Sequence, residues 1–110
     1  MAIAANPGMQ ELLHEFRERV DQIYGDRLLQ VILFGSEARG DAGPESDIDM
    51  VLVFRGEVVP GQEITRLGPL LAEFNLRFAR LISVVPLSAA QYEATDEPFL
   101  RQVRQEGIAV

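Results

Sequence analysis

The sequence predicts an α/β fold in which a small mixed β-sheet of three or more strands is flanked by helices. Two observations lead to this prediction. Segments with apolar residues at helical spacing alternate with short, almost continuously apolar runs. The first pattern is typical of amphipathic helices, and the second of strands covered on both faces. A chain of 110 residues is long enough for one core, so we expect residues 1–110 to form a single domain.

The first half of the chain is expected to contain one long helix and two strands. Apolar side chains recur every three or four residues over 7–24, and Gly25 follows as a C-cap. The run Leu28–Phe34 is nearly all apolar and predicts the first strand. The second strand is expected over Ile48–Phe54. One of its faces carries four apolar side chains, namely Ile48, Met50, Leu52 and Phe54.

The second half begins with helical spacing from Pro60 to Phe78. Proline lacks a backbone donor and its ring clashes with the preceding turn, so we expect a kink or a fresh start at Pro69. The main helical segment would then be Pro69–Phe78. A third strand is expected over Leu81–Val85, ending at Pro86.

Two short helices are expected after the third strand. The pattern Ser88-x-x-Gln91 resembles a capping box, which opens a helix by satisfying two backbone donors. A last helix is expected over Pro98–Glu106, closed by Gly107.

Composition narrows the classes of function. Ten basic residues stand against seventeen acidic ones, giving a net charge of −7, which argues against a nucleic-acid-binding surface. All the basic residues are arginine, so a Walker-type phosphate loop and Schiff-base chemistry, which need lysine, are excluded. Without cysteine there is no disulfide or thiolate site. No signal peptide or apolar run of about 18 residues is present, so we expect a cytoplasmic protein without a membrane span.

Asp47 and Asp49 stand at the start of the second predicted strand. Residues two apart in a strand point to the same face, so these carboxylates share a face with Val51 and Val53. Two like charges there repel each other. A divalent cation would remove the repulsion, and carboxylate oxygens are ligands that Mg²⁺ prefers. The pair therefore predicts half of a magnesium site.

The loop before these aspartates has residues suited to a phosphate. Gly35 allows a ligand to approach the backbone closely, and Ser36 offers a hydroxyl and an N–H. Residues 37–39 can form a helical turn whose first N–H groups face an anion, and the Arg39 guanidinium suits phosphate. An ordinary turn followed by two solvated aspartates is the alternative; the combined spacing is more specific than either motif alone.

The pattern Gly35-Ser36-x-Ala38-Arg39-Gly40, followed by Ser46-Asp47-x-Asp49, resembles the signature of the polymerase-beta-type nucleotidyltransferases. It is most similar to the minimal, single-domain members called MNT, many of which are antitoxins paired with HEPN toxins. The resemblance covers most of the chain and implies a nucleotidyltransferase fold. It implies that Gly35, Ser36, Arg39 and Ser46 bind the nucleotide, and that Asp47 and Asp49 bind Mg²⁺ and act in catalysis.

The third predicted strand departs from this family. Full nucleotidyltransferases carry a third carboxylate there, which completes the metal site and helps to deprotonate the attacking hydroxyl. Here the strand contains no acidic residue, and Ser83 is its polar candidate. Glu45 or Glu73 would serve only if the fold brings one of them close.

The resemblance implies Mg²⁺-dependent transfer of AMP, or another nucleoside monophosphate, from ATP or another triphosphate to a hydroxyl of a protein or small molecule. The alternative is a catalytically weakened, antitoxin-like module that binds and masks a HEPN-type partner. A weaker third reading is aminoglycoside modification, which suits the acidic charge but lacks the extra domain such substrates need. Beyond the nucleotide, the expected partner is a HEPN-type protein or a second copy of the chain.

Overall fold

A computed structural model of the chain describes residues 7–43, 46–94 and 96–110. In chain order the elements are α1 (Pro7–Tyr24), the 3₁₀ helix η2 (Gly25–Arg27), β1 (Leu28–Phe34), α2 (Ser36–Arg39), β2 (Ile48–Phe54), α3 (Pro60–Phe78), β3 (Ile82–Ser88), α4 (Ala89–Ala94), α5 (Pro98–Glu106) and β4 (Ile108–Ala109).

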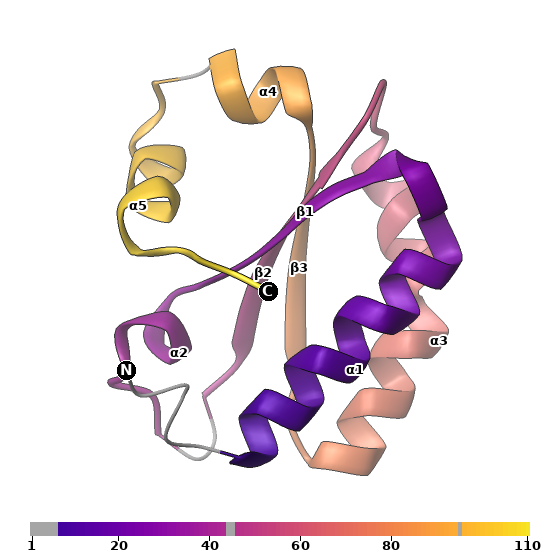
Figure 1. The fold of residues 1–110 in the computed structure, drawn as a ribbon, viewed down its shortest axis with the longest axis vertical. Coiled ribbons are helices and arrows are strands. Elements are labelled where there is room, and N and C mark those ends of the chain that lie inside the picture. The colour runs from indigo at the N-terminus through magenta and orange to yellow at the C-terminus, as the bar shows by residue number, and fades with distance from the viewer. Residues whose placement is uncertain (1–6, 44–45, 95) are drawn as a thin grey trace.

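The four strands form one sheet in the order β3-β2-β1-β4 (Figure 1). Strand β1 runs antiparallel to both β2 and β4, whereas β2 and β3 are parallel. The long helix α3 makes the crossover between these parallel strands, as such a pair requires. The mixed α/β sheet expected from the sequence is confirmed.

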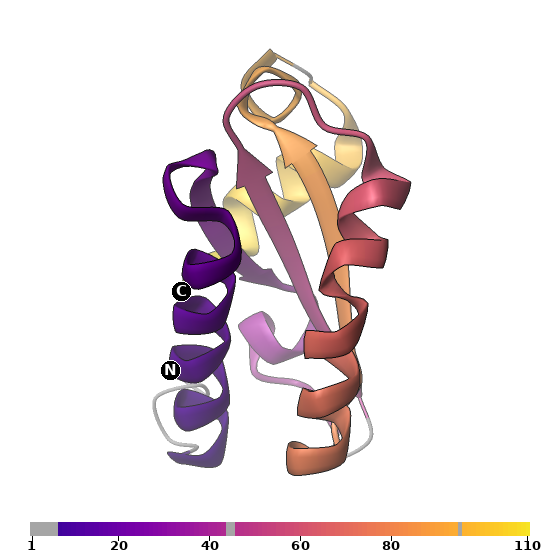
Figure 2. The same ribbon diagram turned by 90° about the vertical axis from the view of Figure 1, so that its right-hand side faces the viewer.

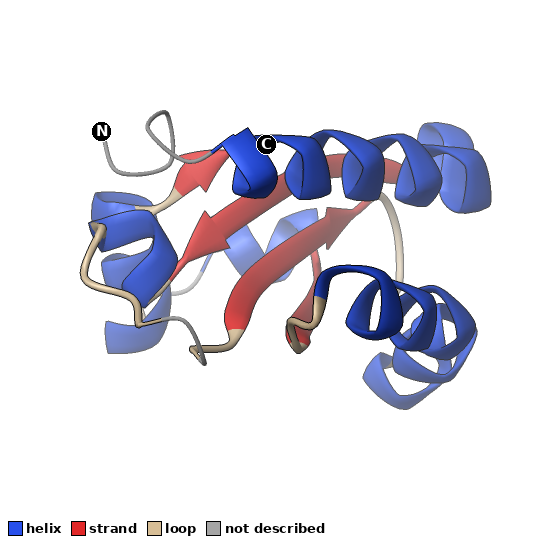
Figure 3. Cartoon of the chain, turned by 90° about the horizontal axis from the view of Figure 1, so that it is seen from below, coloured by secondary structure: helices blue, strands red, loops and turns tan. Residues whose placement is uncertain are grey.

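Each face of the sheet has its own apolar core. Helices α1 and α3 cover the face that carries Ile48, Met50, Leu52 and Phe54, and they lie side by side in Figure 2. The opposite face carries Val51 and Val53 and packs against α4 and α5. Figure 3 shows the strands between helices on both sides. Side chains alternate between the two faces along β2, so Asp49 lies on this second face, at the end where the strand begins. The candidate site is therefore on the face that packs against α4 and α5.

Several local predictions are confirmed. The helices over 7–24 and 98–106 and the strands over 28–34 and 48–54 have the expected bounds. At the start of α4, the Gln91 N–H donates to Ser88 Oγ at 3.1 Å, and the Ser88 N–H donates to Gln91 Oε1 at 2.9 Å. These two bonds form the capping box that the spacing predicts.

The helix start expected at Pro69 and the strand end expected at Pro86 need correction. No new helix begins at Pro69, because α3 runs from Pro60 to Phe78. Pro69 is exposed, so water can reach the carbonyl that lacks its helical donor, and Gly68 has no Cβ to clash with the proline ring. Strand β3 likewise continues through Pro86 to Ser88. It is an edge strand, where proline is tolerated.

The short strand β4 has no counterpart in the sequence prediction. It pairs Ala109 with Ile32 and Ile108 with Leu33, and the Val110 N–H donates to the Val31 carbonyl at 2.9 Å. A two-residue strand is too short to show a periodic pattern in the sequence. Its position depends on pairing with the edge of β1. Within residues 7–43, 46–94 and 96–110, no helix has the length and apolar character needed to cross a bilayer.

Candidate functional site

The backbone at the end of β1 lies directly against a carboxylate. Gly35 has φ +76° and ψ −154°, a conformation that is essentially confined to glycine. A Cβ built on Gly35 would lie 2.6 Å from Asp49 Oδ2, closer than non-bonded atoms approach. Glycine is therefore needed here both for its backbone angles and for the space that Asp49 occupies.

Asp49 lies between two neighbouring strands on the same face of the sheet. Its Cα partner is Phe34 on β1 and Ser83 on β3, and directly paired residues project to the same side. Asp47 precedes β2 and is exposed, whereas Asp49 is half-buried. The structure thus brings Gly35, Asp47 and Asp49 together, as the sequence predicts.

The electrostatics of Asp49 reflect this crowding. Burial raises the pKa of its carboxyl, the neighbouring charge of Asp47 raises that pKa further, and the Arg39 guanidinium lowers it. A carboxylate that is partly desolvated beside a like charge is stabilised by a bound cation. The repulsion inferred from the spacing of the two aspartates is therefore present in the fold.

Asp47 and Asp49 fit a magnesium ion in the chemistry of their oxygen donors. Mg²⁺ is usually held by one or two carboxylates together with water and substrate phosphates. Among the residues described by the structure, no group of three His, Cys, Asp or Glu side chains is placed to hold a metal. These residues therefore supply two carboxylates, and phosphate or water would have to complete the coordination.

A hydroxyl lies beside Asp49 on the neighbouring strand. Ser83, the polar candidate on the third predicted strand, is the Cα partner of Asp49. Glu73 does not lie near Asp49, because it is on α3, which covers the opposite face of the sheet. Its carboxylate accepts bonds of 2.7 and 2.9 Å from the Arg19 guanidinium. Glu45 lies outside the described residues.

Arg39 lies at the end of α2, close to the site, and its guanidinium is bound to two carboxylates. Its Nε donates to Asp41 at 3.1 Å, and one terminal nitrogen donates to Glu106 of α5 at 3.3 Å. The partner Asp41 is 60% exposed and Glu106 is 31% exposed. Both pairs therefore contribute little to stability, and the more exposed pair with Asp41 can yield to a phosphate. Ser36 begins α2, and its carbonyl accepts the Gly40 N–H at 2.9 Å.

Ser46 helps to shape the loop that delivers Asp47. Its hydroxyl accepts the Gly43 N–H at 2.9 Å, and its carbonyl accepts a bond of 2.8 Å from the Arg80 guanidinium. The same guanidinium nitrogen of Arg80 is bound to Glu37 on α2. Both side chains of this ion pair are mostly buried, at 16% and 13% exposure. Arg80 thus ties α2 and the loop before Asp47 to the start of β3.

Arg80 is the positioning residue that the sequence reasoning did not find. It stands after α3, 34 residues from Ser46 and 43 from Glu37. An isolated arginine at that separation has no local signal. The one available cue is that Arg80 immediately precedes the third strand, whose start lies beside the start of β2 in a parallel pair.

Comparison with known proteins identifies the family to which this chain belongs. A family model described as the nucleotidyltransferase domain matches residues 13–92. A candidate protein adenylyltransferase of Methanocaldococcus jannaschii is 35% identical over 101 residues, which are 91% of this chain and 96% of that protein. The chain therefore belongs to the nucleotidyltransferase domain family. A second candidate protein adenylyltransferase of the same organism is 35% identical over 80 residues, covering 70% of this chain and 53% of its own length.

Solved structures share the fold. A candidate nucleotidyltransferase from Sulfolobus solfataricus aligns with a TM-score of 0.62 and 25% identity, covering 98% of this chain and 84% of its own. A toxin–antitoxin structure with AMP-PNP aligns with a TM-score of 0.60 and 18% identity, covering 86% and 69%. A candidate minimal nucleotidyltransferase aligns with a TM-score of 0.57 and 23% identity, covering 91% and 94%. At these identities the last two show the fold alone.

Proposed function

We propose that this chain binds a nucleoside triphosphate together with Mg²⁺ and transfers the nucleoside monophosphate, AMP from ATP, to a hydroxyl of a protein or small molecule. The observation that carries the proposal is the contact between Gly35 and Asp49. It places a backbone that a ligand can approach closely beside a carboxylate suited to a metal ion. The similarity to candidate protein adenylyltransferases supports AMP as the transferred group.

In this proposal each residue has a distinct task. Gly35 and Ser36 hold the triphosphate, and Arg39 exchanges its exposed partner Asp41 for a phosphate oxygen. Asp47 and Asp49 would hold Mg²⁺, which supplies positive charge to offset that of the phosphates. The acceptor hydroxyl oxygen forms a bond to the α-phosphorus and loses its proton to water. The bond from that phosphorus to the bridging oxygen breaks, and pyrophosphate leaves with the charge that develops there.

Calorimetry tests nucleotide binding directly. ATP should bind with Mg²⁺ present and at least tenfold more weakly after its removal with a chelator, because the phosphates then face two unneutralised carboxylates. Asp49→Asn should weaken Mg²⁺-dependent binding to a similar degree. Asp26→Asn is the matched control, since Asp26 lies in η2 at the opposite end of β1. Equal ATP affinity with and without the metal would contradict the proposed site.

A second candidate function is an antitoxin-like module whose catalysis is weakened. The observation that favours it is Ser83 opposite Asp49, because a serine hydroxyl cannot accept a proton at neutral pH as a carboxylate does. The fold shared with a toxin–antitoxin structure supports a protein partner. We propose a HEPN-type protein, or alternatively a second copy of this chain.

Co-expression with the product of a neighbouring gene separates the two functions. Size-exclusion chromatography would show whether the proteins elute together, and mass spectrometry would show whether either carries a nucleotide adduct. A complex with adducts on the partner supports transfer. A complex without adducts supports the masking module. Separate elution at every salt concentration would contradict the partner assignment.

A further inference from the structure

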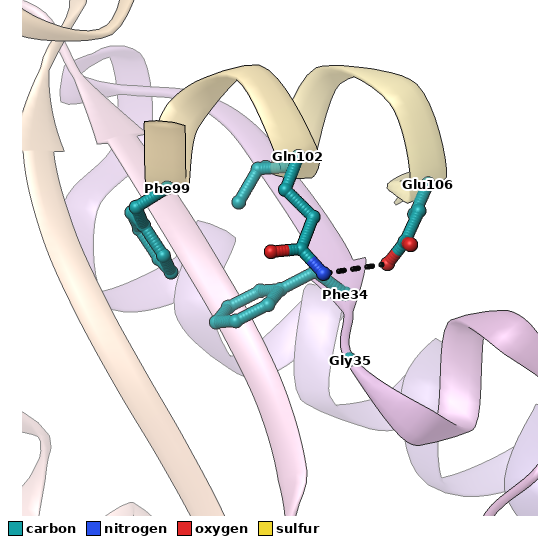
Figure 4. A pocket seen from close by; sticks show the side chains of 6 residues that line it. Phe34, Gly35, Phe99, Gln102 and Glu106 are labelled. Atoms are coloured by element: carbon teal, nitrogen blue, oxygen red, sulfur yellow. Dashed lines mark hydrogen bonds between the residues drawn. The ribbon is translucent and has the colours of Figure 1, made fainter. Parts of the chain in front are cut away.

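A cavity adjoins the phosphate side of the candidate site. It has a volume of about 120 Å³ and lies between the end of β1 and helix α5. Its lining residues are Phe34, Gly35, Phe99, Gln102, Val103 and Glu106 (Figure 4). Gly35 contributes both to this cavity and to the contact with Asp49, so a ligand with its phosphates at Gly35 lies beside the cavity.

The walls of the cavity suit a flat ring. The Phe34 and Phe99 rings lie edge to face, with centroids 5.4 Å apart and an interplanar angle of 85°, and Figure 4 shows both rings on one side of the hollow. Aromatic faces stack on nucleobases irrespective of base identity. The cavity is smaller than the pockets that enclose a whole drug-sized ligand, which begin at about 300 Å³, so it fits one planar group of a larger molecule.

One polar side chain, Gln102, lies at the rim of the cavity. Gln102 Nε2 donates to Glu106 Oε2 at 3.4 Å, and Figure 4 shows Gln102 Oε1 turned toward the two phenylalanine rings. The amide therefore presents an acceptor to the cavity while one of its two N–H groups is bonded to Glu106. Glu106 also accepts a bond from Arg39 at 3.3 Å, which holds this carboxylate in place.

We propose that the cavity takes the nucleobase of the bound nucleotide and favours a base with an exocyclic amino group, as in adenine. This inference rests on the proposed function, since the phosphates must lie at Gly35 and Ser36. Phe34 and Phe99 supply the contact with the ring, and Gln102 Oε1 accepts the amino N–H. A base with a carbonyl in that position meets a second acceptor there and loses the bond.

Calorimetry in the presence of Mg²⁺ tests the proposal with ATP, inosine triphosphate and inorganic tripolyphosphate. ATP should bind about tenfold or more tightly than tripolyphosphate, as expected for one stacked base. Inosine triphosphate, which carries a carbonyl in place of the amino group, should bind about two- to tenfold more weakly than ATP.

Gln102→Phe fills the mouth of the cavity and should lower ATP affinity about tenfold while leaving tripolyphosphate affinity unchanged. Gln105→Phe makes the same change at an exposed position of α5 outside the cavity lining and should affect neither ligand. Equal wild-type affinities for ATP and tripolyphosphate, or an unchanged ATP affinity in Gln102→Phe, would overturn this inference alone. Failure of the wild type to bind either ligand would overturn the proposed function and this inference with it.

Discussion

Ser83 lies directly opposite Asp49 on the neighbouring parallel strand, with both side chains on the face that carries the candidate site. In the proposed function, a carboxylate at this position would share the metal with Asp49, and the chain has a hydroxyl there. A hydroxyl adds neither negative charge nor a base that is active at neutral pH. For the proposed function we therefore expect slow turnover with retained nucleotide binding.

Ser83→Asp should restore the missing carboxylate. Without metal the variant should be less stable than the wild type, because three like charges then crowd one strand end. With Mg²⁺ and ATP, transfer of label from α-labelled ATP to a bound acceptor should rise by about 10²-fold or more. Asp47→Asn should abolish the transfer.

Ser88→Asp is the control for added charge, because it lies on the same strand but caps α4 away from the site. It should leave both the metal dependence of stability and the transfer rate unchanged. Fast transfer by the wild type that Ser83→Asp slows would place the third ligand elsewhere.

Gly35→Ala should impair folding and nucleotide binding together. The backbone conformation alone is expected to cost about 1–3 kcal/mol in the free energy of unfolding, and the new methyl group must displace the Asp49 carboxylate. Gly61→Ala is the matched control, since a Cβ there meets nothing within 4 Å and lies in the first turn of α3. Urea unfolding and ATP titration would measure both variants. Equal stability and equal ATP affinity of Gly35→Ala and Gly61→Ala would contradict the role assigned to Gly35.

Arg80→Met should lower the free energy of unfolding by about 3 kcal/mol, because it leaves the mostly buried Glu37 carboxylate without its cation. Adding Glu37→Gln should recover much of this stability. ATP affinity should be low in Arg80→Met and stay low in the double variant. In both, the Ser46 carbonyl lacks its donor and the loop before Asp47 is loosened.

Arg77→Met is the control for the loss of an arginine. Its ion pairs with Glu15 and Glu73 are half-exposed, so the free energy of unfolding should fall by less than about 1 kcal/mol. Full recovery of ATP affinity in the double variant would show that Arg80 acts on stability alone.

Tyr24→Phe should flatten the loss of stability at alkaline pH. Burial, and secondarily the nearby Glu63 carboxylate, raises the pKa of Tyr24 from 10.0 to about 12. Between these values the unfolded chain releases the phenol proton and the folded chain keeps it, so stability falls as pH rises. Thermal unfolding of both proteins from pH 9 to 12 measures the difference; parallel curves would show that Tyr24 does not titrate in this range.

The predictable part of the site is local in sequence. Asp47 and Asp49 are two residues apart, so strand geometry alone places them on one face, and Gly35 follows a strand that periodicity reveals. The pairing of Ser83 with Asp49 needed the order and direction of the strands, which the family pattern supplied. The bonds of Arg80 and the contact of Glu106 with Arg39 depend on side chains packed from distant elements, and no local pattern encodes them.

The proline in β3 has a consequence for how copies of this molecule meet in a crowded solution. The Leu81 carbonyl accepts the Ile48 N–H, so odd-numbered residues of β3 turn their backbone toward β2, and even-numbered ones, including Pro86, turn outward. Pro86 has no N–H, and the N–H of Ser88 is held by Gln91. The second half of this open edge offers no free donor to another strand, which protects the sheet from edge-to-edge aggregation.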